Sequence, residues 1–87
     1  MNAGSSSLEV PEELRLLCML HNIGATTPEK SLSLQEICDW TTMETSAVQS
    51  HLQNLMGHGY VGSIKTEGID KYHVTLNGIR KVLSIYS

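Results

Sequence analysis

Residues 33–57 read SLQEICDWTTMETSAVQSHLQNLMG, and this stretch carries the pattern that decides the fold. Ser33 precedes Glu36 by three residues, which is the capping-box spacing found at the start of a helix. The apolar residues that follow at helical spacing supply a buried face. Two consecutive threonines after Trp40 then predict a tight turn and a fresh helix cap. The first half of the stretch is therefore a short helix followed by a turn.

The second half of the stretch predicts another helix, from residue 44 or 45 to residue 56. Val48, Leu52 and Leu55 recur at the spacing of one helix face. If this stripe packs on the core, the opposite, polar side of the helix projects into solvent. Gly57 ends the helix.

The sequence on either side completes the order of elements. Pro11 and the two glutamates after it predict the start of a helix over residues 11–23. Alternating apolar residues around a central turn predict a β-hairpin over residues 60–76. Thr75 or Asn77 can cap a last helix, in which apolar residues again share one face.

The expected order is therefore three helices, a hairpin and a final helix, which is the order of a winged helix-turn-helix. The predicted fold class is α+β, mostly α, with a three-helix core, a two-stranded wing and a C-terminal helix. A chain of 87 residues accommodates one domain, which we assign to residues 9–87. Residues 1–8 are mostly small and polar and predict a disordered leader.

The first predicted helix is apolar on two sides. One stripe includes Leu17, and a second stripe is displaced from it by more than a quarter of a turn. The members of the second stripe are Leu16, Met19, Leu20 and Ile23. A surface helix needs only one apolar stripe. The second is explained equally well by a central helix enclosed in its own domain and by contact with a partner chain.

Three stretches follow one another in an order found in a known group of proteins. They are LQEIC at residues 34–38, TSAVQSHLQNL at 45–55 with GYV at 59–61, and YHVTLNGIR at 72–80. Together they resemble the winged-helix transcription regulators of the MarR, ArsR and PadR type, over roughly residues 32–83. The resemblance implies a sequence-specific DNA-binding regulator of transcription. Its recognition helix, at about 45–56, would enter the major groove, and its wing, at 60–76, would lie on the DNA backbone.

The same resemblance maps the DNA contacts onto one side of the recognition helix. The residues are Thr45, Ser46, Gln49, Ser50 and Gln53. Glutamine can pair with adenine through two hydrogen bonds, and hydroxyl groups contact bases or phosphates. The expected partner is therefore double-stranded DNA.

The charges depart from what is usual in this group, because the recognition helix carries no arginine or lysine. The net charge is −3, and residues 1–41 hold six carboxylates against two cations. Lys65 and Lys71 on the wing, with Arg80 and Lys81 on the last helix, remain as candidates for phosphate contacts. Four cations give weak binding as a monomer. We therefore expect a homodimer through helix 1 and the C-terminal helix, which doubles the number of cations.

A second function is open from the same residues. A winged helix can also serve as a protein–protein interaction module in a transcription or DNA-maintenance complex, without direct DNA binding. The acidic balance, the absence of cations from the recognition helix and the second stripe of the first helix favour this alternative, in which the partner is a protein.

Enzymatic chemistry is not expected, because no catalytic constellation, phosphate-binding loop or compact metal-ligand motif is present. We predict no catalytic residue, no cofactor and no metal. Cys18 and Cys38 are interpreted as reduced thiols in apolar surroundings, and a metal site made from them and His21 is the minor alternative. No apolar run reaches the length of a membrane span, and no signal peptide is evident, so we expect a cytoplasmic protein without a membrane partner.

Overall fold

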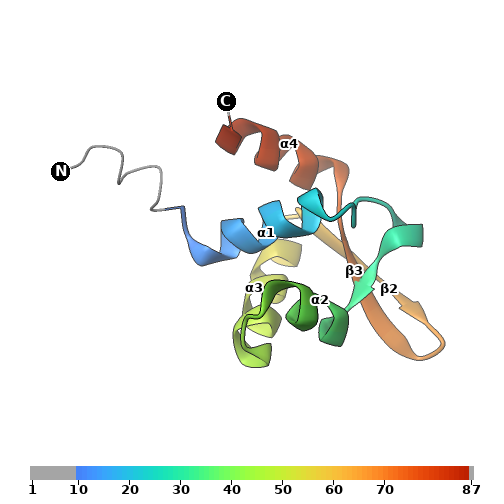
Figure 1. Ribbon diagram of the computed structural model, residues 1–87. Helices are drawn as coiled ribbons and strands as arrows, with labels where there is room; N and C mark the ends of the chain where they lie inside the picture. Colours follow the sequence, from blue (N-terminus) through green and yellow to red (C-terminus); the bar gives the residue numbers. More distant parts are fainter. Residues whose placement is uncertain (1–9, 87) are drawn as a thin grey trace.

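The computed structural model describes residues 10–86, which form four α-helices, a short 3₁₀ helix and one antiparallel sheet (Figure 1). The predicted leader, residues 1–8, lies outside the described residues. In chain order the elements are α1 (Glu12–Asn22), η2 (Pro28–Lys30), β1 (Leu32–Ser33), α2 (Leu34–Thr41), α3 (Thr45–Gly57), β2 (Val61–Thr66), β3 (Ile69–Val74) and α4 (Leu76–Tyr86). The expected α+β winged helix-turn-helix, mostly helical, is confirmed.

The start of α2 has the local geometry that the sequence predicts. The backbone N–H of Glu36 donates to Ser33 Oγ at 3.2 Å, and the backbone N–H of Ser33 donates to the Glu36 carboxylate at 2.9 Å. These two bonds form a capping box and satisfy two backbone donors that a helix start otherwise leaves unpaired. At the other end Thr42 adopts a left-handed conformation, with φ of 56°, and turns the chain into α3.

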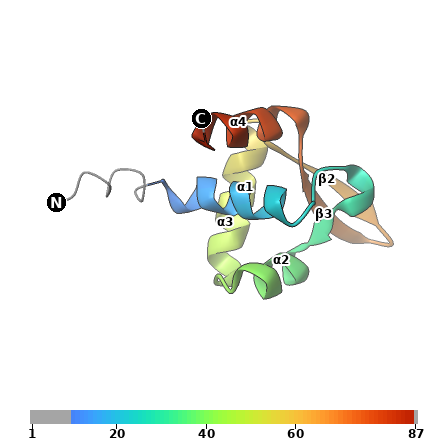
Figure 2. The same ribbon diagram turned by 45° about the horizontal axis from the view of Figure 1, so that its top comes forward.

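The sheet has one strand more than the sequence predicts. Its strand order is β1-β3-β2, and both pairings are antiparallel. The two-residue strand β1 pairs with Tyr72 and Lys71 at the base of the wing, beside the start of α2. A strand of two residues is too short to show the alternation by which strands are recognised. The wing itself, β2 and β3, extends away from the helices (Figures 1 and 2).

Helix α1 lies at the centre of the molecule, with α4 on one side and α2 on the other (Figures 1 and 2). Leu16, Leu17 and Leu20 are fully buried, so the domain's own core takes residues from both apolar stripes of this helix. Met19 remains 38% exposed. The second stripe is therefore used mainly inside the domain, which favours the enclosed-helix interpretation for most of its length.

The junction between the wing and α4 is held by one threonine and one glycine. Thr75 Oγ1 donates to the carbonyl of Gly59 at 2.6 Å and accepts from the backbone N–H of Gly78 at 3.0 Å, which confirms the predicted cap. Gly78 is buried, and a Cβ atom there would collide with the backbone carbonyl of Tyr60. This close approach fixes how α4 packs on the sheet.

Helix α4 buries less of its apolar face than the sequence predicts. Val82 is fully buried, but Leu83 and Tyr86, which were expected to share its face, are 55% and 61% exposed. Leu76, at the start of the helix, is 64% exposed. At about 100° per residue, residues 76, 83 and 86 fall within an arc of about 80° and therefore lie along one side of the helix. We call these three residues the α4 strip.

Candidate nucleic-acid interface

The outer side of α3 presents free polar side chains. Val48, Leu52 and Leu55 are buried, which leaves the opposite side of the helix in solvent. The five residues mapped there by resemblance are all exposed, and they cover an arc of about 140° at about 100° per residue: Thr45, Ser46, Gln49, Ser50 and Gln53. Among residues 10–86, the side chains at positions 46, 49, 50 and 53 have no hydrogen-bond partner. They are available to a ligand.

Thr45 is the member of this group with a partner in the protein. Its hydroxyl accepts from Cys38 Sγ at 3.7 Å, a contact that joins the end of α2 to the start of α3. Both residues line an open hollow of about 660 Å³ between α2, α3 and the wing. Gln49 and Lys71 line the same hollow, so the structure brings these two predicted residues together with Thr45.

Lys65 has a different environment from Lys71. It does not line the hollow, and its ammonium group forms an ion pair with the Asp70 carboxylate at 3.2 Å. The two residues face each other across the wing, and their side chains are 66% and 56% exposed. The sequence indicates Lys65 as a phosphate contact, but it does not reveal Asp70 as the partner of this lysine.

Carboxylates also enter the hollow. Glu36 and Asp70 both line it, beside Lys71. The hydrogen bond from the Ser33 backbone is the main cause that holds the pKa of Glu36 below its ordinary value, and the charge of Lys71 acts in the same direction. Glu36 is therefore ionised near neutral pH. The hollow beside α3 holds two carboxylates and one lysine.

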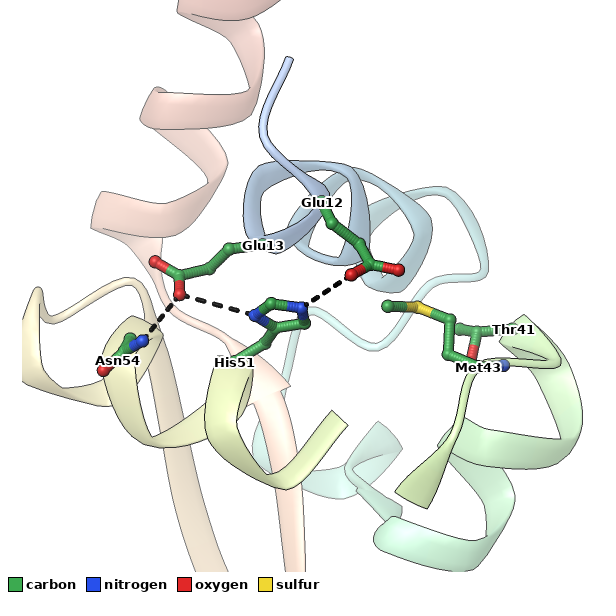
Figure 3. Close-up of polar contacts among 6 residues, drawn as sticks. All are labelled: Glu12, Glu13, Thr41, Met43, His51 and Asn54. Carbon is green, nitrogen blue, oxygen red and sulfur yellow. Dashed lines mark hydrogen bonds and ion pairs between the residues drawn. The ribbon is translucent and has the colours of Figure 1, made fainter. Parts of the chain in front are cut away.

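A separate group of polar contacts ties α3 to the first turn of α1 (Figure 3). His51 Nε2 lies 3.2 Å from the Glu12 carboxylate, and His51 Nδ1 lies 3.5 Å from that of Glu13. Asn54 Nδ2 donates to Glu13 Oε1 at 2.8 Å. Asn54 is thus engaged with α1, although its position in the sequence indicates an outward side chain. The polar side chains of α3 that remain without a partner in the described part of the chain are those at positions 46, 49, 50 and 53.

The two cysteines lie in different places. Cys18 and Cys38 are both free and half-buried. Cys38 lines the hollow beside α3, whereas Cys18 lines a second hollow between α1 and α4. Residues 10–86 contain no group of three or more histidine, cysteine or acidic side chains that could hold a metal ion.

The face formed by α1 and α4 differs in character. Its hollow has a volume of about 600 Å³ and is lined by Val10, Arg15, Cys18, Met19, Asn22, Ile85 and Tyr86. Of the α4 strip, Tyr86 lines this hollow, whereas Leu76 and Leu83 lie outside it. Asn22 Nδ2 donates to the Tyr86 hydroxyl at 3.5 Å and links the two helices at their ends. In the described part of the chain, no helix is long and apolar enough to cross a membrane.

The sequence matches no protein-family model. It is 31% identical over 74 residues to the DNA-binding protein TubR of a Clostridium botulinum C phage, a match that covers 84% of this chain and 91% of that protein. The solution structure of a DNA-binding TubR fragment from Clostridium botulinum is similar, with a TM-score of 0.76 and 28% identity, over 87% of this chain and 95% of the fragment.

A MarR family protein from Bacillus stearothermophilus shares the fold, with a TM-score of 0.71 and 16% identity, over 88% of this chain and 51% of that protein. The predicted resemblance to MarR-type winged-helix regulators is therefore confirmed. The relationship to TubR is closer in sequence and extends over most of both chains. Because of this similarity in sequence, the chain belongs to the TubR family.

Proposed function

We propose that this chain is a sequence-specific DNA-binding protein that regulates transcription. The observation that carries the proposal is the outer face of α3, where exposed side chains at positions 46, 49, 50 and 53 have no partner within residues 10–86. Polar groups of this kind hydrogen-bond to base edges in the major groove. Two similarities support DNA binding. The relative is the DNA-binding protein TubR, and the similar solution structure is that of a DNA-binding TubR fragment.

In this proposal α3 enters the major groove, and the wing lies against the sugar-phosphate backbone. Gln49 is the best placed base-reading residue, because its amide can bond to adenine through both a donor and an acceptor. Lys71 shares a hollow with Gln49 and Thr45, so a phosphate that approaches α3 from the wing side would meet its ammonium group. Lys65 offers a second phosphate contact at the outer part of the wing.

We further propose that the chain binds DNA as a homodimer through α1 and α4. The α4 strip exposes three large apolar side chains, and one of them, Tyr86, also lines the hollow between α1 and α4. A second copy that covered this face would remove apolar surface from water. It would also place two copies of α3 on one duplex, which matches a two-fold symmetric site.

Action in the cytoplasm, as expected from the sequence, remains a prediction.

The test is a selection of duplexes from a random-sequence library, followed by fluorescence anisotropy on the selected duplex and on a scrambled version. We expect the selected duplex to bind more tightly by at least about a thousandfold, the lower end of the range for specific regulators. If neither duplex binds below about 100 μM at low salt, which is weaker than ordinary non-specific binding, the DNA-binding proposal fails. The protein-interaction alternative would then take its place.

A further inference from the structure

We propose that Asp70 is an internal competitor for DNA phosphate, which holds Lys65 and thereby sets the strength and salt dependence of DNA binding. The inference rests on the proposed DNA-binding function and deepens it. It assigns a role in the interface to a carboxylate, a residue type that ordinarily repels DNA. It also explains how a wing with two lysines can contribute little charge to the interface.

The geometry of the wing produces this competition. Lys65 and Asp70 are directly opposite each other in the β2–β3 register, and their charged groups are 3.2 Å apart. The two-residue turn at Glu67 and Gly68, with φ of 53° and 81°, fixes that register. The hairpin therefore holds the two residues at facing positions on neighbouring strands.

The same arrangement accounts for the charge of the whole wing. Between residues 61 and 74 the chain carries Lys65 and Lys71 against Glu67 and Asp70, so the wing has no net charge. Lys71 in turn acts on Glu36 of α2, whose pKa is held low mainly by the Ser33 backbone and also by this lysine. Lys65 is thus paired with a carboxylate of the same chain, and Lys71 shares a hollow with another, Glu36.

The strength of the pair decides the size of the effect. Both side chains are more than half exposed, and an exposed ion pair contributes only a modest factor because water and salt screen it. A phosphate can therefore compete with Asp70 for the ammonium group, but the nearby carboxylate offsets the positive charge that Lys65 presents to the DNA. The net release of counterions, which drives binding of lysine to phosphate, is reduced by up to about one per wing.

The experiment compares the intact chain with Asp70→Asn on a labelled mixed-sequence duplex of roughly 20 base pairs, or two helical turns. Anisotropy is measured between about 50 and 200 mM salt. We expect Asp70→Asn to bind more tightly by roughly two- to fivefold for each wing on the duplex, which is the factor that one exposed pair is worth. The salt slope should become steeper by up to about one per wing. Asp39→Asn, which makes the same charge change on α2, should have a smaller effect.

A double variant separates release of Lys65 from simple loss of a repulsive charge. In the Lys65→Ala background, Asp70→Asn should tighten binding clearly less than it does in the parent chain, because no ammonium group remains to be released and only the repulsion between carboxylate and phosphate is removed. A gain of equal size in both backgrounds, or a gain in the parent chain equal to that of Asp39→Asn, overturns the inference. Urea midpoints of all variants should stay close to that of the parent chain, as expected for exposed side chains.

The outcomes also distinguish this inference from the proposed function. If the parent chain binds the duplex and Asp70→Asn binds it equally well, the DNA-binding function stands and the role of Asp70 is wrong. If neither the parent chain nor any variant binds, the proposed function fails, and the inference fails with it.

Discussion

Helices α4 and α2 lie on opposite sides of α1 (Figures 1 and 2), and two surfaces of the domain, that of α3 with the wing and that of α1 with α4, differ in chemistry. The face of α3 and the wing exposes uncharged polar side chains, and its two lysines are each near a carboxylate. The face of α1 and α4 exposes Leu76, Leu83 and Tyr86 and contains an apolar hollow. One face is suited to directional hydrogen bonds, and the other is suited to the burial of apolar surface.

The difference shows that neither face is sufficient alone. Hydrogen bonds to bases confer specificity, but phosphate contacts supply much of the affinity for DNA. Few unpaired cations are available beside α3, so one copy would bind weakly. Association through the α4 strip would join two such faces and multiply their effect. In the proposed dimer, the apolar face would thus compensate for the weak charge of the polar face.

The largest expected effect comes from a core substitution, because it destabilises the whole domain and both faces with it. Leu52 is 1% exposed and anchors α3 to the core. Leu52→Ala should lower the free energy of unfolding by about 2–5 kcal/mol, because it leaves a cavity among close-packed side chains. Urea denaturation followed by circular dichroism measures this change. Gln53→Ala, the exposed neighbour, should shift stability by less than about 0.5 kcal/mol; equal shifts for both variants would show that the orientation of α3 is wrong.

A matched pair of apolar side chains tests whether the two faces have different roles. Leu83 on α4 and Ile69 on the wing are 55% and 53% exposed. Leu83→Asp should halve the mass measured by light scattering at micromolar concentration, because a charge would be buried in the dimer. Its apparent affinity for DNA should fall by about a hundredfold through loss of the second copy.

The matched control on the other face is Ile69→Asp. This change should leave the mass of the dimer unaltered and weaken DNA binding only by adding a negative charge next to the phosphates. A parent chain that is monomeric in light scattering, or a Leu83→Asp variant that retains the parent's dimeric mass, would rule out the α1–α4 interface.

A smaller effect separates base contacts from phosphate contacts within the polar face. Gln49→Ala should weaken binding to the selected duplex by about 1–3 kcal/mol and leave binding to the scrambled duplex nearly unchanged. Lys71→Ala should instead weaken both complexes to a similar degree and lower the salt slope by about one. Anisotropy at several salt concentrations measures both quantities. If Gln49→Ala affects the two duplexes equally, Gln49 does not read bases.

Local and periodic features of the fold could be predicted from the sequence. The capping box of Ser33 and Glu36, the buried stripe of α3 and the cap at Thr75 depend on residues a few positions apart. Their physical causes, backbone hydrogen bonding and the helical repeat, are visible in a single stretch of sequence. The same features allow the orientation of α3 to be predicted, and with it the exposure of the five polar candidates.

Features that depend on long-range pairing could not be predicted. His51 and Asn54 contact glutamates about 40 positions earlier in the chain, and no periodicity links such distant residues. The ion pair of Lys65 and Asp70 was missed for another reason. The sequence alone predicts a turn over residues 67–70, which would include Asp70, but this prediction is wrong, because the observed two-residue turn places Asp70 on β3, opposite Lys65. A change of two residues in turn length therefore decides whether Lys65 has a partner.

The smallest expected effect concerns the charge of Glu36, at the edge of the polar face. Its pKa in the folded chain is lowered, mainly by the Ser33 backbone N–H, so its ionised form stabilises the fold. This stabilisation is fully present above the pKa of the unfolded chain and is lost as the pH falls through the lower folded pKa. Glu36→Gln removes the charge but keeps a side chain that can complete the capping box.

The variant should therefore be less stable than the parent chain by about 0.3–1 kcal/mol at neutral pH, a value kept small because the carboxylate is exposed. The difference should disappear in acid, where the parent's carboxylate is also neutral. Urea midpoints between about pH 7 and pH 3, on either side of the ordinary glutamate range, measure it. A difference that stays constant across this range would mean that hydrogen-bond geometry, and not charge, separates the two chains.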